Sequence, residues 1–107
     1  MIGLDIVDIS RFRKLKRTSA VLEKAFTSRE LDYCFAFKDP APHLAGLFAA
    51  KEAVAKALNG QAVVYEIEIR QEKNGQPKVW RKNKQDKKMA ISITHTEEIA
   101  AAIAIKL

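Results

Sequence analysis

Three ionisable side chains interrupt the alanine-rich segment 44–58, in which no other residue is charged: Lys51, Glu52 and Lys56. Glu52 and Lys56 are four residues apart, so on a helix they share one face and lie one turn from each other. Buried charges are costly unless they are paired or used. The spacing alone favours an ordinary surface ion pair, whereas the apolar surroundings favour a functional site. Both interpretations stay open at this point.

A further carboxylate, Asp5, lies within the apolar segment 2–7, although aspartate is disfavoured in strands. It is either a charge at a sheet edge that points to solvent or a ligand. Proteins bind Mg2+ through one or two carboxylates together with phosphate oxygens and water. Asp5 and Glu52 are therefore the candidate magnesium ligands, and the chain has no Cys/His cluster of the kind that binds zinc.

Two histidines complete the set of candidate residues. His95 falls on the same alternating face as Ile91 and Ile93. A histidine on an apolar strand face is more often a core residue than a catalyst, so its pattern alone favours a structural role. His43 precedes the apolar part of a predicted helix, and we interpret it as structural or exposed.

The first half of the chain predicts one strand and three helices that must position these residues. Segment 2–7 alternates as a strand, and Asp8 suits the N-cap of a helix. This helix would bury Ile9, Phe12 and Leu15 and expose a basic face made of Arg11, Arg13, Lys14 and Arg17. Segment 27–30 has the spacing of a capping box and predicts a second helix through about residue 37. The third helix should run from about residue 42 to residue 58, with Asn59-Gly60 ending it.

The sequence predicts mainly strands in the second half of the chain. Segment 62–71 alternates in part, Asn74-Gly75 is a turn signal before segment 78–80, and 81–88 is a charged connection. Segments 90–95 and 99–105 are two more predicted strands. The fold class is therefore α+β, with an N-terminal strand and helices followed by an antiparallel sheet, and with one long buried helix.

Length and charge narrow the class of protein. The 107 residues suit a single domain, 1–107, and 19 Lys and Arg against 13 Asp and Glu give a net charge of +6. This excess favours an anionic partner such as nucleic acid, a phosphate-rich ligand or an acidic protein. The single cysteine, Cys34, fits a reducing compartment. No apolar run has the roughly 20 residues that a bilayer requires, so we expect a cytoplasmic protein and no membrane partner.

Three segments together resemble the holo-[acyl-carrier-protein] synthase family of 4'-phosphopantetheinyl transferases. They are Gly3-Leu4-Asp5-Ile6-Val7 with Arg11 following, Phe48-Ala49-Ala50-Lys51-Glu52-Ala53 with Lys56 following, and Ser92-Ile93-Thr94-His95-Thr96. Segments 66–69 and 74–77 also match the family's strand and turn. The resemblance implies the 4'-phosphopantetheinyl transferase fold and transfer of phosphopantetheine from coenzyme A to a serine of an apo acyl carrier protein, in fatty acid biosynthesis.

The resemblance also implies roles for individual residues. Asp5 and Glu52 match the ligands of Mg2+, and Glu52 would take the serine proton. Lys56 matches the lysine on the coenzyme A phosphates, and His95 matches the histidine near the reacting groups. Small members are homotrimers with active sites between subunits, so His95 would face the Asp5, Glu52 and Lys56 of a neighbour. The basic helix would dock the acidic carrier through Arg11 and Lys14.

Two positions depart from the family pattern. Leu47 stands where many members have Arg, and only Asn59-Gly60-Gln61 remains of a glycine-rich loop. Lys51 or a basic residue of 81–88 would then supply the missing coenzyme A phosphate contact. A degenerate family member and a basic nucleic-acid-binding module, the latter suggested by Trp80 beside segment 81–88, remain the alternatives; the main interpretation includes no nucleic acid partner.

Overall fold

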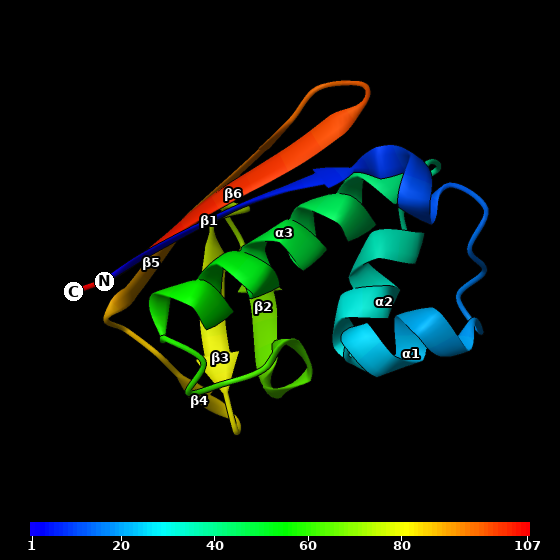
Figure 1. The fold of residues 1–107 in the computed structure, drawn as a ribbon. Helices are drawn as coiled ribbons and strands as arrows, with labels where there is room; N and C mark the ends of the chain where they lie inside the picture. Colours follow the sequence, from blue (N-terminus) through cyan, green and yellow to red (C-terminus); the bar gives the residue numbers. More distant parts are fainter.

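Two three-stranded antiparallel sheets and one long helix form the framework of the computed structural model, which describes residues 1–107. The first sheet has the order β1 (Ile2–Asp8), β6 (Ile99–Lys106), β5 (Met89–His95). The second has the order β2 (Ile67–Gln71), β3 (Pro77–Arg81), β4 (Lys84–Gln85). The helices are α1 (Ala20–Ala25), α2 (Ser28–Phe35) and α3 (Ala41–Ala57). Figure 1 shows α3 beneath the first sheet, with α1 and α2 at one end.

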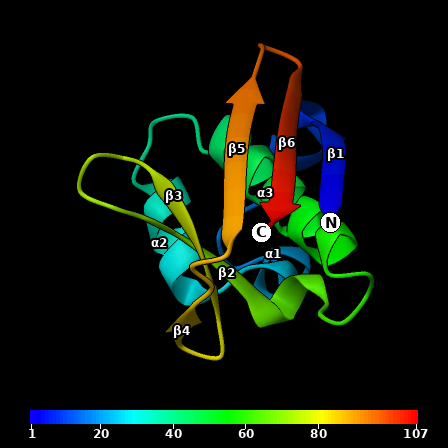
Figure 2. The ribbon, with the colours of Figure 1, turned by 90° about the vertical axis from the view of Figure 1, so that its left-hand side faces the viewer.

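Small residues allow α3 to lie directly against the first sheet. Figure 2 shows β5, β6 and β1 side by side in front of this helix. The inner face of β6 consists of Ala100, Ala102 and Ala104, all buried. A Cβ atom added at Gly3 would lie only 1.8 Å from the carbonyl oxygen of Ala53. Glycine at position 3 is therefore needed for β1 to cross α3 at this distance.

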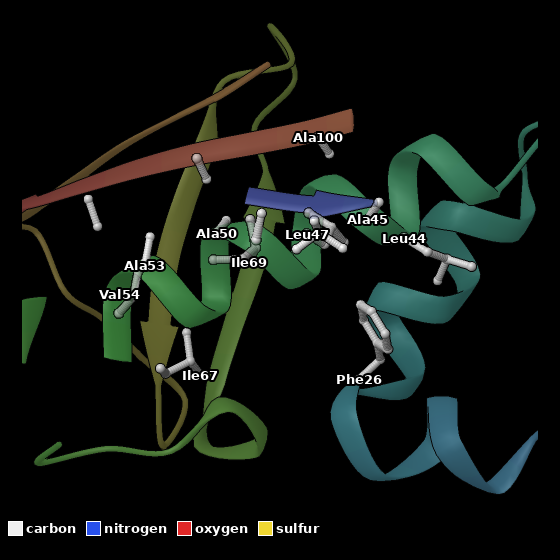
Figure 3. Close-up of a cluster of buried hydrophobic side chains, with 14 of the residues drawn as sticks. Phe26, Leu44, Ala45, Leu47, Ala50, Ala53, Val54, Ile67, Ile69 and Ala100 are labelled. Carbon is white, nitrogen blue, oxygen red and sulfur yellow. The ribbon is translucent and has the colours of Figure 1, made fainter. Parts of the chain in front are cut away.

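The hydrophobic core surrounds α3 and forms a single cluster of 25 buried residues. Figure 3 shows Ala50, Ala53 and Val54 of this helix near Ile67 and Ile69 of β2, and Phe26 near Leu44 at the other end. The rings of Phe12, Phe26 and Phe48 lie together, with centroids 5.8 to 6.3 Å apart. Because α3 is packed on most sides, its sequence is apolar on nearly every face.

Local signals explain the boundaries of α2 and α3, both of which the sequence predicted. The Thr27 hydroxyl accepts a hydrogen bond from the Glu30 amide, and the Glu30 carboxylate accepts one from the Thr27 amide, which confirms the capping box. At the end of α3, Asn59 and Gly60 have φ values of 52° and 76°. The Gly60 amide donates to the carbonyl oxygen of Ala55, which ends the helix.

The predicted first helix is absent. Only a 3-10 turn, Ile9–Phe12, follows β1, and Asp8 makes no side-chain capping hydrogen bond. Five cations in 11–17 would meet as like-charge neighbours on an α-helix, which destabilises it. Two of them instead reach other segments: Arg13 pairs with Asp39 at 2.6 Å, and Arg17 pairs with Asp32 at 2.5 Å. The short helix α1 that comes next was not predicted.

The predicted strands are present, except that residues 62–66 are not part of β2 and include a 3-10 turn, Val64–Glu66. The strands form two sheets rather than one. β1 joins the first sheet through β6, with Asp5 opposite Ala102. Segment 81–88 is more than a connection, because Lys82 and Asn83, with φ values of 52° and 62°, form a tight turn into β4. The α+β class is confirmed. None of the helices is both long enough and apolar enough to cross a membrane.

Candidate active site

Asp5 and Lys56 meet where β1 crosses α3. The Lys56 ammonium donates to the Asp5 carboxylate at 3.3 Å and to the Leu4 carbonyl oxygen at 3.0 Å. The Asp5 side chain is 18% exposed and that of Lys56 54% exposed. The inner face of β1 places Asp5 between Gly3 and Val7, so its carboxylate lies at the flank of α3 and not in the sheet core.

Glu52 lies one helical turn before Lys56 on the same face of α3. β1 runs antiparallel to α3, since Gly3 lies at Ala53 whereas Arg11, beyond the end of β1, lies over Phe48. Asp5 therefore passes the part of the helix that carries Glu52 and Lys56. Glu52 is half-buried, and its carboxylate has no hydrogen-bond or ion-pair partner within the chain. It is the acidic group of this site that is free to accept a proton or bind a cation.

The oxygen atoms at this crossing fit a hard cation. The Asp5 carboxylate and the Leu4 carbonyl oxygen already hold the positive charge of Lys56. Carboxylate oxygens are also the ligands that Mg2+ prefers. No group of three or more His, Cys, Asp or Glu side chains is arranged to hold a metal. An ion at Asp5 and Glu52 would therefore take its other ligands from water and from phosphate oxygens of a substrate.

Lys51 lies elsewhere, and the structure contradicts its predicted contact with coenzyme A. Its side chain has no exposed surface, and its ammonium donates to the Glu30 carboxylate and to the Ala25 carbonyl oxygen, both at 2.6 Å. The other Glu30 oxygen accepts the Ile69 amide at 2.8 Å. The pair links α2, α3 and β2 inside the protein. Burial raises the pKa of the Glu30 carboxyl, and the Lys51 ammonium opposes that rise.

The sequence contains a signal for this burial. The residues seven and four positions before Lys51, and three and seven after it, share its side of the helix. All four are apolar and buried: Leu44, Leu47, Val54 and Leu58. Cys34 lies close to the same pair, fully buried, and burial raises the pKa of its thiol to about 12.

His95 and His43 form a second cluster, at the N-terminal end of α3. His95 ends β5, is exposed, and its Nδ1 atom lies 3.0 Å from the Thr96 carbonyl oxygen. Its ring centroid is 6.5 Å from that of His43. The His43 ring stacks on Phe37 with centroids 3.6 Å apart and meets Tyr33 edge-on. Sequence reasoning gave His43 no role, because only the fold brings it next to His95.

One chain does not bring His95 to the two carboxylates. His43 and Glu52 are nine residues apart on α3, which at about 100° per residue places them on opposite sides of the helix. Asp5 and His95 lie on the outer strands of the first sheet, with β6 between them. Two strand spacings separate those backbones by about 10 Å. The Asp5–Glu52–Lys56 cluster and the His43–His95 cluster therefore flank α3 on its two sides.

The basic segment after β1 offers three unpaired cations. Arg11, Lys14 and Lys16 are exposed and form no ion pair, whereas Arg13 and Arg17 are held by carboxylates. The Arg11 guanidinium lies 5.3 Å above the ring of Phe48 and 5.7 Å above that of Phe12. These contacts fix its position beside α3 without neutralising it, which suits the recognition of an acidic surface.

Leu47, one of the two positions that depart from the family pattern, has an apolar side chain that offers no contact to a phosphate. Leu47 is buried and lines a cavity of about 400 Å3 together with His43, and no Lys, Arg, Asp or Glu lines this cavity.

Trp80, the aromatic residue that suggested nucleic acid binding, is covered by the Arg70 guanidinium, which lies 3.9 Å from the ring centroid. One face of its ring is therefore already occupied by Arg70.

Comparisons with known proteins agree on one family. Residues 1–104 match the 4'-phosphopantetheinyl transferase superfamily. The holo-[acyl-carrier-protein] synthase of Caldicellulosiruptor bescii is 40% identical over 97% of this chain and 94% of its own. That of Chlamydia caviae is 41% identical over 99% and 95%. The crystal structure of the Helicobacter pylori holo-[acyl-carrier-protein] synthase in complex with coenzyme A has a TM-score of 0.83 at 29% identity, with both chains fully covered.

Proposed function

Because this chain belongs to the 4'-phosphopantetheinyl transferase superfamily, we propose that it transfers the 4'-phosphopantetheine group of coenzyme A to a serine of an apo acyl carrier protein. The products are the holo carrier protein and 3',5'-ADP. One observation carries the proposal: a chain similar over its whole length to holo-[acyl-carrier-protein] synthases has Asp5, Glu52 and Lys56 on one flank of α3.

The residues at the crossing of β1 and α3 have separate tasks in this reaction. Asp5 and Glu52 would hold Mg2+, which supplies positive charge to the diphosphate of coenzyme A. Glu52 takes the proton of the carrier serine as the serine oxygen bonds to the β-phosphorus. The bond from that phosphorus to the oxygen of 3',5'-ADP breaks. Lys56 is exposed and can turn from Asp5 to the departing phosphate, whose negative charge it stabilises.

His95 acts from a neighbouring subunit, and we propose a homotrimer with an active site at each subunit boundary. The opposite positions of the two clusters on α3 support this arrangement. In it, His95 orients the diphosphate of a coenzyme A molecule that is bound to the Asp5, Glu52 and Lys56 of the next subunit. Each site would then need two chains.

The outer face of the first sheet supports the association of subunits. Ile2, Leu4 and Ile6 of β1 are 64 to 68% exposed, and Ile99 and Ile105 of β6 are 38 to 39% exposed. The pairing of β1 with β6 places Ile103 beside Leu4, so these side chains form one continuous apolar surface. Surfaces of this kind are rare on monomers and mark interaction sites.

The carrier protein would dock on the basic segment after β1. Arg11 and Lys14 are two of the unpaired cations there, and their charge attracts an acidic carrier and steers its approach. We further propose that residues 1–107 work as one domain in the cytoplasm, where the single thiol stays reduced. The acyl carrier protein of fatty acid biosynthesis is the proposed partner.

Mass spectrometry tests the function directly. The protein is incubated with coenzyme A, Mg2+ and several apo carrier proteins. Transfer would add roughly 340 Da, the mass of the phosphopantetheine group, to the carrier under this mechanism. Glu52→Gln should abolish the gain and leave the circular dichroism spectrum unchanged. No gain with any carrier would favour a family member that has lost the activity, and transfer by Glu52→Gln would contradict the role of Glu52.

A further inference from the structure

His43 is held in a fixed orientation beside His95. Its ring lies flat on Phe37, with an interplanar angle of 12°, and the Tyr33 ring packs against it at 88°. Three ionisable groups face it from the elements around it: His95 from β5, Tyr33 from α2, and Asp39 from the segment before α3. The Asp39 carboxylate is already bound by Arg13. A positive charge on His43 therefore has no unpaired carboxylate to neutralise it.

The cavity next to this pair carries no fixed charge. It has a volume of about 400 Å3 and is lined by His43, Gly46 and Leu47 of α3, by Gly75 in the turn before β3, and by Pro77 at the start of β3. No lysine or arginine lines it. A phosphate that enters this region can gain a cation only if an imidazole takes up a proton, since imidazole alone changes its charge near neutral pH.

We propose that His43 and His95 together form a proton-dependent phosphate subsite, in which His43 becomes protonated when a phosphate group of coenzyme A binds. The inference rests on the proposed function, which places coenzyme A beside His95. A phosphate has several acceptor oxygens, so it can receive hydrogen bonds from both rings. The sequence pattern indicated no ligand role for His43. Its protonated ring would supply the positive charge that the apolar side chain of Leu47 cannot supply.

The direction of the proton linkage follows from the surroundings. Burial lowers the pKa of His43, and the neighbouring His95 lowers it further, so His43 is neutral in the free protein near pH 7.5. A bound phosphate dianion favours the charged ring and raises its pKa. Binding then takes up a proton, and affinity falls as pH rises through the pKa of the bound state. One linked proton weakens affinity by up to about tenfold per pH unit.

Calorimetry of 3',5'-ADP binding tests the inference without any carrier protein. The wild-type protein is titrated with Mg2+ present between pH 7 and 8.5, where a phosphomonoester is already mostly a dianion because its second pKa is about 6. Buffers of different ionisation enthalpy give the number of protons taken up per site. His43→Phe keeps an aromatic ring for the stack on Phe37 and should lower the uptake by up to one proton, with a flatter pH profile of Kd.

Two further variants make the comparison specific. His43→Gln keeps a hydrogen-bonding side chain without the charge, so it should match His43→Phe. Lys38→Gln removes a permanent cation from the exposed segment before α3 and should leave proton uptake unchanged. If both His43 variants take up as many protons on binding 3',5'-ADP as the wild-type protein, and the wild-type protein is active, the inference is overturned and the proposed function is not. Failure of the wild-type protein to bind 3',5'-ADP or coenzyme A would overturn both the inference and the proposed function.

Discussion

Lys51 and Glu30 form the most deeply buried charge pair of the protein, since neither side chain has any exposed surface. Each polar atom of the pair has a partner: the ammonium has two oxygens, and the carboxylate accepts amides of Thr27 and Ile69. A buried charge that loses its partner is costly, typically by about 3–5 kcal/mol. Lys51 therefore contributes to the stability of the folded protein.

Lys51→Met should destabilise the protein by about 3–5 kcal/mol at pH 7.5, because Glu30 would be left buried without its cation. Lys56→Met, which removes an exposed lysine from the same helix, should cost less than about 1 kcal/mol. Urea unfolding monitored by circular dichroism measures both changes. Equal losses in the two variants would contradict the structural role of Lys51.

The loss caused by Lys51→Met should shrink as pH falls from 7.5 toward 5. Burial already raises the pKa of the Glu30 carboxyl, and without the ammonium of Lys51 it must rise further. A folded-state pKa above the unfolded value means that the folded protein binds more protons in that range. Its stability therefore increases on acidification relative to the wild type. A gap that stays constant down to pH 5 would show that Glu30 remains ionised in the variant.

The site residues differ in how well the sequence could indicate them. Glu52 and Lys56 could be paired from their spacing alone, because four residues make one helical turn. Asp5 could be singled out as a charge in an apolar strand, but its contact with Lys56 depends on how β1 crosses α3. Lys51 was misassigned although its apolar helical neighbours were visible. His43 was missed because its proximity to His95 is set by tertiary packing alone.

At the scale of elements, the crossing of β1 over α3 depends on the missing side chain of Gly3. Gly3→Ala would place a Cβ atom 1.8 Å from a helix carbonyl oxygen, which cannot move without bending α3. We expect a loss of about 3 kcal/mol or more. Gly46→Ala is the control, because its Cβ would meet only the Ile93 side chain, at 3.1 Å. That variant should stay within about 1 kcal/mol of the wild type, as measured by urea unfolding.

The basic segment between β1 and α1 can be tested apart from the catalytic elements. Arg11→Glu combined with Lys14→Glu should lower kcat/KM for the carrier by about tenfold at low ionic strength and much less in 0.5 M salt, because the attraction is screened. The KM for coenzyme A should not change. Lys24→Glu combined with Lys73→Glu changes the net charge equally elsewhere on the surface. An equal loss in that control would show that overall charge, and not this segment, attracts the carrier.

Elements whose ends carry local signals could be predicted, and those set by long-range contacts could not. The capping box of α2 and Asn59-Gly60 after α3 act within a few residues, so their positions are visible in the sequence. The predicted first helix fails because its cations bind carboxylates that lie 15 and 26 residues away in the chain. The place of β1 in the first sheet depends on its pairing with β6, across nearly the whole chain.

At the scale of the whole molecule, the apolar outer face of β1 and β6 should hold the trimer together. Ile103→Glu places a charge in the middle of that face, so light scattering after size exclusion should show monomers. Transfer activity should fall by about 100-fold or more, because each site would lack the histidine of a neighbour. Val21→Glu, at a residue of α1 that is 62% exposed, should change neither property. A wild-type protein that is already monomeric and active would refute the shared site.

Mixed trimers test which residues each chain contributes. His95→Ala and Asp5→Ala chains should each be inactive alone. If they assemble at random from equal amounts, about a quarter of the subunit boundaries combine an intact Asp5 with an intact His95. Activity of mixtures prepared by co-expression should therefore recover to about a quarter of the wild-type value. No recovery in trimers shown by mass spectrometry to be mixed would place both residues in a site within one chain.

Cys34 makes the packing of α2 on the core observable in solution. Its thiol is fully buried, and its pKa of about 12 leaves almost no thiolate at neutral pH. Alkylating reagents can react with it only after the surrounding structure opens. Because the chain has no other cysteine, the rate of alkylation reports on that opening without interference from a second thiol. Weakening the nearby Glu30–Lys51 pair should increase the rate at which Cys34 is alkylated.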